Sequence, residues 1–461
     1  MQDRFEHETV LVIGLGKSGL ASTAVLRERG AVVFATDEKV REGLLDAIAA
    51  IEAHGARFVA PADLDEILDR ITSAVLSPGI PPTSAVVRRV VSAGIPVIGE
   101  VELAWRLCGA PIVAVTGTKG KSTTTALIGA LLRACARDVR VGGNIGDPLV
   151  GQVGSAAPSS WVVAEVSSFQ LETIRTFRPR IAVLLNVVPD HLDRYRSLDE
   201  YADAKLRIAV NQGVGDTLVI DLDDPRLAAF RTRREREGCR MRILGYTLRD
   251  ARGVAMSLHG EQICYAPPDG DAMPILDRAD VPLAGEHNLR NVMAALLAAL
   301  AAGCEIAPLR DAVRAFHALP HRLQAIGEVD AVLYVDDSKA TNPDAAIAAL
   351  TAYDRPVVLI AGGRSKGTDF AKFGAAIRAR AKALIAIGES AEEIARAAGD
   401  VPHEIAESVE DAVERARRYA RPGDVVLLSP ACASFDMFAS AEERGERFTR
   451  AVNALREGVR A

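Results

Sequence analysis

A glycine-rich segment of the 461-residue chain has the residue types that bind the phosphates of a nucleotide. The sequence PIVAVTGTKGKSTTTALIGALL predicts a buried strand, a loop and a helix that starts near Ser122. The amides of such a loop can surround phosphates, Lys121 can reach the β- and γ-phosphates, and the Ser122 hydroxyl suits Mg²⁺. The usual Walker loop has its first glycine where this chain has Val115, so we expect ATP to bind through a variant geometry. The other loop residues expected to bind ATP are Gly117, Thr118, Gly120 and Thr123.

Polar residues follow two further apolar runs, at positions where open α/β sheets hold their ligands. Mg²⁺ prefers oxygen ligands, so Glu165 fits a metal site well and His191 fits it less well. A single Glu or His after a strand is usually a capping residue or a surface residue. Two such strand ends beside a phosphate loop favour a metal site instead. Lys205, in YADAKLRIAV, has by itself the features of a solvated helix lysine. The strand ends carry Glu165 in the first run and Asn186, Asp190, His191 and Asp193 in the second.

A second glycine-rich turn lies near the start of the chain. Val10 to Ile13 form a predicted strand, Gly14 to Gly19 open a helix, and Asp37 follows the next strand. In a dinucleotide-binding turn of this form, glycines let the backbone approach a pyrophosphate. The residues allow an NAD-dependent dehydrogenase and equally a tight turn without a ligand, because glycines at such turns also serve close packing. Ser77-Pro78-Gly79 ends another strand and could add a second phosphate-facing loop.

The elements that must position these residues alternate between strands and helices. Short apolar runs such as TVLVIGLG, AVVFATD, IAVLLNV and PVVLIAGG are separated by helix-like segments, which is the pattern of parallel sheets in an α/β protein. We predict three domains, at residues 1–99, 100–318 and 319–461. Between Gly238 and Leu283 the sequence indicates short strands and turns, which predicts an antiparallel insertion at the end of the middle domain.

Composition excludes several classes of protein. Lys and Arg total 55 against 61 Asp and Glu, and the net charge of −6 argues against nucleic-acid binding. The longest uncharged apolar stretch, Val292 to Cys304, is shorter than the roughly 20 residues of a membrane span, so it predicts a buried helix. The start MQDRFEHETV shows no secretory signal, and we expect a cytoplasmic protein without a membrane partner. The absence of a CxxC pair argues against a zinc site or a disulfide framework among Cys108, Cys135, Cys239, Cys264, Cys304 and Cys432.

Several motifs follow one another along the chain: VTGTKGKSTTT, GGNIGDP, AEVSSFQLE, NVVPDHLDRY, YADAKLRI, GEHNLRN, LPHRLQ, DDSKATNP and LLSPACASFDMF. Together they resemble, over nearly the whole chain, the Mur ligases of peptidoglycan synthesis. DSKATN and SPACASFD discriminate best, because folylpolyglutamate synthetases share the phosphate loop and differ there. The resemblance implies a Rossmann-like N-terminal domain, a central P-loop-type ATPase domain with a parallel sheet, and a Rossmann-like C-terminal domain.

The resemblance also implies a reaction. ATP phosphorylates the carboxylate of UDP-N-acetylmuramoyl-L-alanine, the amino group of D-glutamate attacks the acyl phosphate, and the tetrahedral intermediate collapses to an amide and phosphate. A carboxylate is a poor electrophile until one oxygen becomes a good leaving group, and the developing charge needs cations. We therefore expect an ATP-dependent amide ligase that acts as a monomer on small-molecule substrates.

Roles for single residues follow from the same resemblance. Lys121 would hold the γ-phosphate, Ser122 and Glu165 one Mg²⁺, and His191 a second. Lys205 would be carbamylated, which turns an amine that repels metal into a carboxylate-like ligand. Lys121, His191 and Lys205 would thus be the catalytic residues.

Substrate residues are implied in the same way, although any one asparagine or arginine among them could simply cap a helix or form a surface ion pair. The adenine would lie near Asn288 and Asn291, and the ATP clamp would use Arg322 and Asp337. The UDP part would lie against Gly16, Ser18, Asp37, Ser77 and Gly79, and the muramoyl-alanine part against Asn144 and Gln170.

The amino-acid site would contain two lysines and two hydroxyl groups, which suit a substrate with two carboxylates. Its residues would be Lys339, Thr341, Lys366, Ser434 and Phe435. The chain departs from the common family pattern at Ser365, Met437 and Ala441, so L-glutamate or another acidic amino acid stays open as the substrate. Two other classes of function also stay open. One is an NAD-dependent oxidoreductase that uses the glycine-rich turn near the start of the chain. The other is a catalytically silent nucleotide-binding regulator, which is disfavoured by the presence of Lys121, Glu165, His191 and Lys205.

Overall fold

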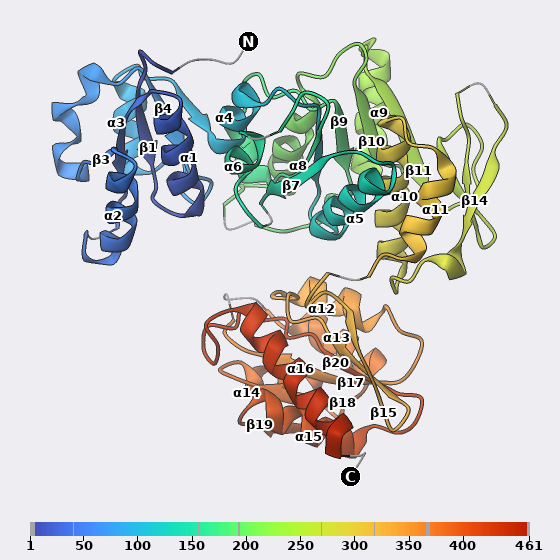
Figure 1. The fold of residues 1–461 in the computed structure, drawn as a ribbon. Helices are drawn as coiled ribbons and strands as arrows, with labels where there is room; N and C mark the ends of the chain where they lie inside the picture. Colours follow the sequence, from blue (N-terminus) through green and yellow to red (C-terminus); the bar gives the residue numbers. More distant parts are fainter. Residues whose placement is uncertain are drawn as a thin grey trace. The chain divides into compact units, whose positions relative to one another are not determined.

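The computed structural model describes residues 5–39, 41–144, 146–154, 156–191, 194–268, 270–317, 319–365 and 369–458. The chain divides into two compact units (Figure 1). The first unit consists of Met1–Asp280 with Arg290–Arg314, and the second of Val281–Leu289 with Ala315–Ala461. Within the parts described, no helix is long and apolar enough to cross a membrane.

The first sheet has the strand order β3-β2-β1-β4-β5, and its described pairings are parallel. These are the first five positions of the Rossmann strand order 3-2-1-4-5-6, so the Rossmann-like prediction for the N-terminal domain is confirmed. Most strand residues are buried, as expected for a parallel sheet covered by helices. The elements are β1 (Thr9–Ile13), α1 (Lys17–Glu28), β2 (Val32–Thr36), α2 (Leu45–Ala53), β3 (Arg57–Phe58), β4 (Ser73–Leu76), α3 (Ala85–Ser92) and β5 (Val97–Gly99).

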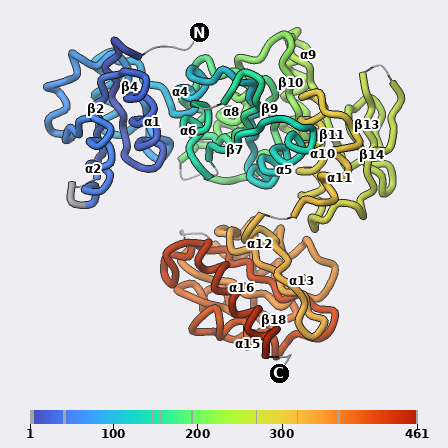
Figure 2. The backbone as a smooth tube through the Cα atoms, viewed as in Figure 1, coloured from blue at the N-terminus to red at the C-terminus, as the bar shows by residue number. Residues whose placement is uncertain are grey.

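The central sheet has the order β14-β13-β12-β11-β10-β9-β6-β8-β7. Its strands are β6 (Ile112–Thr116), β7 (Val139–Gly143), β8 (Trp161–Glu165), β9 (Ile181–Leu184), β10 (Thr217–Asp221), β11 (Arg242–Thr247), β12 (Met256–His259), β13 (Gln262–Tyr265) and β14 (Met273–Asp277). Its helices are α4 (Glu100–Leu107), α5 (Lys121–Ala134), α6 (Leu149–Val153), α7 (Ser168–Glu172), α8 (Leu198–Leu206), α9 (Pro225–Arg236), α10 (Glu286–Ala301) and α11 (Ile306–Arg314). Helix α11 packs against α5 (Figure 2).

The antiparallel insertion predicted between Gly238 and Leu283 is only partly correct. Strands β12, β13 and β14 pair antiparallel as predicted, but β11 pairs parallel with both β10 and β12. Helix α9 connects β10 to β11, and a crossover of this kind is what a parallel pair requires. The stretch from Val292 belongs to α10 and is buried, as predicted.

The second unit contains a sheet of order β15-β16-β20-β17-β18-β19, in which β15 runs antiparallel to β16 and the other described pairings are parallel. One apolar cluster joins the sheet to α15 and α16, and another joins it to α12, α13 and α14, so helices cover both faces. The strands are β15 (Gln324–Val329), β16 (Val332–Asp336), β17 (Val357–Gly362), β18 (Ala381–Ile387), β19 (His403–Ala406) and β20 (Val425–Leu428). The helices are α12 (Pro343–Leu350), α13 (Ala371–Arg380), α14 (Ala391–Ala398), α15 (Val409–Tyr419) and α16 (Ala441–Gly458).

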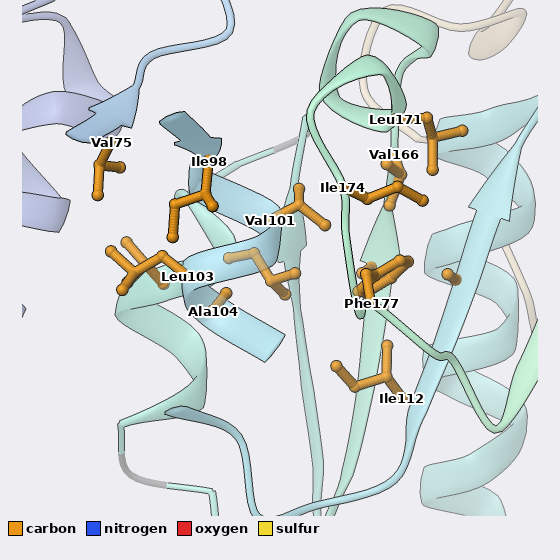
Figure 3. Packing of buried hydrophobic residues seen from close by; sticks show 14 of the residues in the cluster. Val75, Ile98, Val101, Leu103, Ala104, Ile112, Val166, Leu171, Ile174 and Phe177 are labelled. Carbon is orange, nitrogen blue, oxygen red and sulfur yellow. The ribbon is translucent and has the colours of Figure 1, made fainter. Parts of the chain in front are cut away.

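Helix α4 joins the first sheet to the central sheet through continuous apolar packing. Val75 and Ile98 of the first sheet belong to the same buried cluster as Val101 of α4 and Ile112 of β6 (Figure 3). Phe177, which precedes β9, belongs to this cluster as well. Because packed interiors have few voids, this shared core keeps the two sheets together as one unit.

A buried glutamate on α4 reinforces this junction. The carboxylate of Glu102 accepts hydrogen bonds from the amides of Arg175, Thr176 and Phe177 at 2.8–3.0 Å and from the Thr176 hydroxyl at 2.6 Å. Burial by itself would raise the pKa of Glu102, but these hydrogen bonds together lower the pKa by more than burial raises it. The pKa of Glu102 therefore lies below its ordinary value. The charged carboxylate therefore stabilises the fold.

We predict that Glu102→Ala lowers the free energy of unfolding by about 3 kcal/mol. The reason is that the backbone amides of Thr176 and Phe177 lose the carboxylate that accepts their hydrogen bonds. Urea denaturation measures this loss, with the exposed Glu66→Ala as the matched control. Since the pKa of Glu102 is lowered in the folded state, its contribution is complete above the ordinary glutamate pKa and is lost as pH falls through the folded pKa. A difference between the proteins that grows on acidification would contradict this assignment.

Candidate active site

The predicted phosphate loop lies between β6 and α5. The Lys121 ammonium donates to the carbonyls of Gly117 and Thr118, at 2.9 Å each, so the lysine folds back over its own loop. Gly120 precedes α5 with φ of 83°, in the left-handed region that glycine adopts at little cost. A Cβ atom at Gly120 would also overlap the amide oxygen of Asn291, so the loop and α10 approach each other closely at this point.

Asn186, which follows β9, fixes the phosphate loop to the neighbouring strand. Its Oδ1 accepts from the amides of Thr118 at 3.1 Å and Lys119 at 2.9 Å, and its Nδ2 donates to the Lys119 carbonyl at 3.1 Å. The sequence pattern places Asn186 among the polar residues of a possible metal site. In the structure its side chain is hydrogen-bonded to the phosphate loop instead. The only sequence signal for this contact was its position at a strand end beside the loop.

The structure contradicts the prediction, made from residues alone, that Lys205 is a solvated helix lysine. The side chain lies in α8 with 1% of its surface exposed, and its Nζ donates to the Gly117 carbonyl at 2.8 Å. The Tyr201 ring centroid lies 4.5 Å away. Burial, together with the positive charge of Lys121, lowers the pKa of Lys205 to about 6, so the amine is largely neutral at pH 7.

Glu165 ends β8 close to these lysines and is 3% exposed. Its Oε1 accepts from the Asn144 side-chain amide at 2.9 Å, which brings together two residues predicted for different parts of the site. Its Oε2 is buried, with no hydrogen-bond partner among the residues described. A buried carboxylate oxygen without a partner is costly, and a cation would satisfy it.

His191 lies beside the same group of residues. Its φ of 54° is unusual for a residue with a side chain, and the Asp190 side chain accepts from its amide at 3.0 Å. The imidazole contacts the Phe169 ring edgewise, with 4.9 Å between centroids, and lies 6.1 Å from the Tyr201 ring that covers Lys205. No cluster of three or more His, Cys, Asp or Glu residues is found in the described portions of the chain. Asp193 lies outside the described residues.

The first glycine-rich turn is stabilised by two of its predicted ligand residues. The buried Asp37 accepts from the Leu15 amide at 2.7 Å, and the Ser77 hydroxyl donates to the Gly14 carbonyl at 2.8 Å. A Cβ atom at Gly19 would overlap the Gly14 carbonyl, so this glycine serves close packing of the turn. At the exposed Gly16 and Gly79 an added Cβ would meet no atom within 4 Å, and Ser18 is partly exposed, so this side of the turn is open to a ligand.

One cavity in the first unit brings together Ser77, which follows β4 of the first sheet, and Gln170 of helix α7. Phe169 and Arg194 also line it, and the guanidinium of Arg194 lies 4.0 Å from the Phe169 ring centroid. Gln170 also takes part in a capping box at the start of α7, because its Oε1 accepts from the Ser167 amide at 2.9 Å. Both apolar and polar side chains line this small cavity.

In the second unit, Asp337 is buried and both of its carboxylate oxygens accept hydrogen bonds. It accepts from the Leu323 amide at 3.1 Å and from the Ser429 hydroxyl at 2.9 Å. Burial raises the pKa of Asp337 to about 7, although Arg322 acts in the opposite direction. Arg322 and Asp337 are thus neighbours, as the predicted clamp requires.

The predicted amino-acid residues differ widely in exposure. Lys339 pairs with Glu442, Thr341 and Lys339 are partly exposed, Ser434 is buried, and Phe435 is 66% exposed. Lys366 lies outside the described residues. Asn288, also assigned to the second unit, is buried and donates to the Ala284 carbonyl at 2.7 Å.

The three departures from the family pattern also lie in the second unit. The Ser365 amide donates to the Ser390 hydroxyl at 3.1 Å. Met437 packs against the cluster beneath α15 and α16, and the Ala441 carbonyl accepts from the Ser338 hydroxyl at 2.7 Å. Met437 and Ala441 therefore have structural contacts of their own.

Comparison with known proteins identifies the family. The Mur ligase MurD-like N-terminal domain matches residues 8–99, the Mur ligase middle domain 115–299, and the glutamate ligase domain of Mur ligases 321–432. A UDP-N-acetylmuramoylalanine–D-glutamate ligase of Pelotomaculum thermopropionicum is 44% identical over 460 residues, which cover 98% of this chain and 99% of that protein. The chain belongs to the Mur ligase family. A ligase of the same name from Salinibacter ruber is 41% identical over 463 residues, covering 98% of this chain and 99% of the relative.

Solved structures of Mur ligases share the fold. The MurF ligase of Thermotoga maritima, in complex with ADP, aligns with a TM-score of 0.61 at 17% identity and covers all of both chains. The MurC ligase of the same organism aligns with a TM-score of 0.59 at 17% identity, covering 97% of this chain and 100% of that one. The prediction of a three-domain α/β Mur ligase fold is therefore confirmed.

We predict that Asn186→Ala weakens binding of Mg·ADP by about tenfold, because the phosphate loop loses hydrogen bonds worth roughly 1 kcal/mol each. Isothermal titration calorimetry of the purified protein measures the dissociation constant. The exposed Asn453→Ala in α16 is the matched control and should bind as the unaltered protein does. Equal affinity in both variants would show that the loop holds its shape without Asn186.

Proposed function

We propose that this Mur ligase joins D-glutamate to the alanyl carboxylate of UDP-N-acetylmuramoyl-L-alanine, with conversion of ATP to ADP and phosphate. The observation that carries the proposal is the convergence of Lys121 and Lys205 on the Gly117 carbonyl, beside a carboxylate oxygen of Glu165 that has no described partner. Relatives that carry this activity in their names align over nearly the whole chain. The domain boundaries at 1–99, 100–318 and 319–461 and the monomeric state are predictions.

ATP would bind with its phosphates along the loop from Gly117 to Thr123. Lys121 would exchange its carbonyl contacts for the γ-phosphate, because a phosphate is a stronger acceptor for an ammonium group than a neutral carbonyl. Asn288 and Asn291 would lie near the adenine, and Arg322 with Asp337 would complete the ATP site.

The residues present fit a magnesium site. Ser122 and Glu165 would hold one Mg²⁺ and His191 a second, with a carbamylated Lys205 as a further ligand. The ions would supply positive charge to the phosphate oxygens. Glu165 contributes its buried Oε2, which has no partner among the described residues. Lys205 is buried as a largely neutral amine, the form that reacts with CO₂ and releases a proton to become a carbamate.

The nucleotide substrate would bind at the first glycine-rich turn, with Asp37 and Ser77 supporting the turn and Gly16, Ser18 and Gly79 on its open side. The muramoyl-alanine part would lie toward Gln170 and Asn144. The alanyl carboxylate would then lie beside Glu165, because Asn144 is hydrogen-bonded to that residue.

The chemistry follows from this placement. The alanyl carboxylate would attack the γ-phosphorus of ATP and release ADP, and the Lys121 ammonium would stabilise the charge that develops on the phosphate. The glutamate amine would then attack the acyl carbon, and phosphate would leave with the electron pair of the acyl–oxygen bond. Lys339, Thr341, Lys366, Ser434 and Phe435 would hold the glutamate. Addition of L-glutamate or another acidic amino acid is the alternative that Ser365, Met437 and Ala441 motivate.

The decisive experiment measures phosphate release from ATP in the presence of UDP-N-acetylmuramoyl-L-alanine and either enantiomer of glutamate. We expect release with D-glutamate and at least about 100-fold less with L-glutamate, a discrimination of roughly 3 kcal/mol. Release with the L form alone would overturn the assigned specificity. Binding of NADH in place of UDP would instead support the oxidoreductase alternative.

Lys205→Ala should reduce turnover by at least about 10³-fold, because the variant cannot form the carbamate. Added bicarbonate should not restore activity, whereas short-chain carboxylic acids should restore part of it by occupying the vacated space. A ¹³C-bicarbonate NMR signal for the carbamate should appear in the unaltered protein and be absent in the variant. The exposed Lys372→Ala is the control, and full activity of Lys205→Ala would remove the carbamate from the mechanism.

Lys121→Ala should abolish ATP-dependent phosphate release while UDP still binds, because the two sites lie at different sheets of the first unit. Calorimetry with UDP and with Mg·ADP separates the two effects. Loss of UDP binding together with loss of phosphate release would indicate a misfolded protein or one shared site.

A further inference from the structure

An ion cluster at the carboxyl ends of β10 and β11 is not used by the reaction described above. In the first turns of α10, Arg290 places its Nη1 3.1 and 3.2 Å from the two carboxylate oxygens of Asp221 and 2.6 Å from Oδ2 of Asp223. The side chains of Asp221 and Asp223 are 4% and 10% exposed. One guanidinium thus pairs with two largely buried carboxylates.

Both carboxylates are fixed to the sheet independently of Arg290. Asp221 is the last residue of β10 and accepts from the Asp223 amide at 2.9 Å. Asp223 accepts from the Thr247 hydroxyl at 2.7 Å and from the Leu248 amide at 2.9 Å, which attaches it to the end of β11. The cluster therefore ties α10 to two strand ends at a defined position.

Arg249 also pairs with Asp223, at 3.2 Å, but its side chain is largely exposed to solvent. The ion pair to Asp221 in the described structure is made by Arg290. Burial raises the pKa of Asp221 to about 6 even though Arg290 acts in the opposite direction, which agrees with a carboxylate that depends on this partner. Removal of one member of a buried ion pair leaves the other without compensation and is strongly destabilising locally.

The residue after Arg290 reaches the phosphate loop. Asn291 is buried, and its side-chain oxygen occupies the space where a Cβ atom at Gly120 would lie. Gly120 directly precedes Lys121 at the start of α5. Because consecutive residues of a helix move together, the position of Arg290 on the strand ends sets the position of Asn291 against the loop.

We propose that Arg290 is a positioning residue for the nucleotide site: its bridge to Asp221 and Asp223 holds Asn291 against Gly120 in the geometry that binds ATP. The inference rests on the proposed use of this loop for ATP. The UDP site lies at the first sheet, so loss of the bridge should affect the two substrates differently.

Steady-state kinetics of Arg290→Met test this proposal. The KM for ATP and the dissociation constant of Mg·ADP should each rise about tenfold, while the KM for UDP-N-acetylmuramoyl-L-alanine changes less than about twofold. Arg290→Lys keeps the charge and should recover most of the ATP affinity. Arg231→Met, which removes an i,i+4 ion pair on α9, is the matched control and should leave all constants unchanged.

Asp223→Asn provides a second variant that keeps the pair between Arg290 and Asp221, and it should raise the same two nucleotide constants about threefold. Equal rises in the KM of both substrates, or a loss of active protein with unchanged constants, would overturn the proposal and leave Arg290 a purely structural role. The calorimetric constant for Mg·ADP needs no turnover. If the unaltered protein binds Mg·ADP but releases no phosphate, the proposed function fails, while the binding comparison still decides the role of Arg290.

Discussion

The backbone carbonyl of Gly117 accepts hydrogen bonds from two lysine side chains, and much of the site depends on this contact. Lys121 comes from the same loop, and Lys205 comes from a helix that begins some 80 residues later along the chain. Two ammonium groups that share one acceptor repel each other, and burial of one of them adds a desolvation cost. The lowered pKa of Lys205 follows from these two causes. The position that lets Lys205 donate to the Gly117 carbonyl therefore also favours its neutral amine form.

The parallel central sheet is what brings these groups together. Strands β6, β8, β9 and β10 end at the same edge, and each end supplies a polar residue or loop: the phosphate loop, Glu165, Asn186 and Asp221. Their side chains bind one another or the loop backbone, as Asn186 does with Lys119. Buried polar groups need such partners, so each strand end is held by its own set of hydrogen bonds.

Helix α4 connects the central sheet to the first glycine-rich turn. Its apolar face continues the core from one sheet to the next, and Glu102 ties it to the segment before β9. The small cavity lined by Ser77 and Gln170 lies at this junction, so residues that follow the first sheet meet residues of α7 there. No single motif encodes this contact.

The sequence by itself determined the α/β class, the two glycine-rich turns, the phosphate loop and the buried helix after Val292, because these depend on local patterns of apolar residues and glycines. The local sequence around Lys205 is typical of a surface helix. The role of Lys205 as a metal ligand was suggested only by the resemblance to a family. Only the tertiary structure decided that Lys205 is buried, that Asn186 serves the phosphate loop, that β11 runs parallel to β10, and that Arg290 joins α10 to Asp221. These features are contacts between residues distant in sequence, and their energies depend on burial and on neighbouring charges that appear only when the strands assemble side by side.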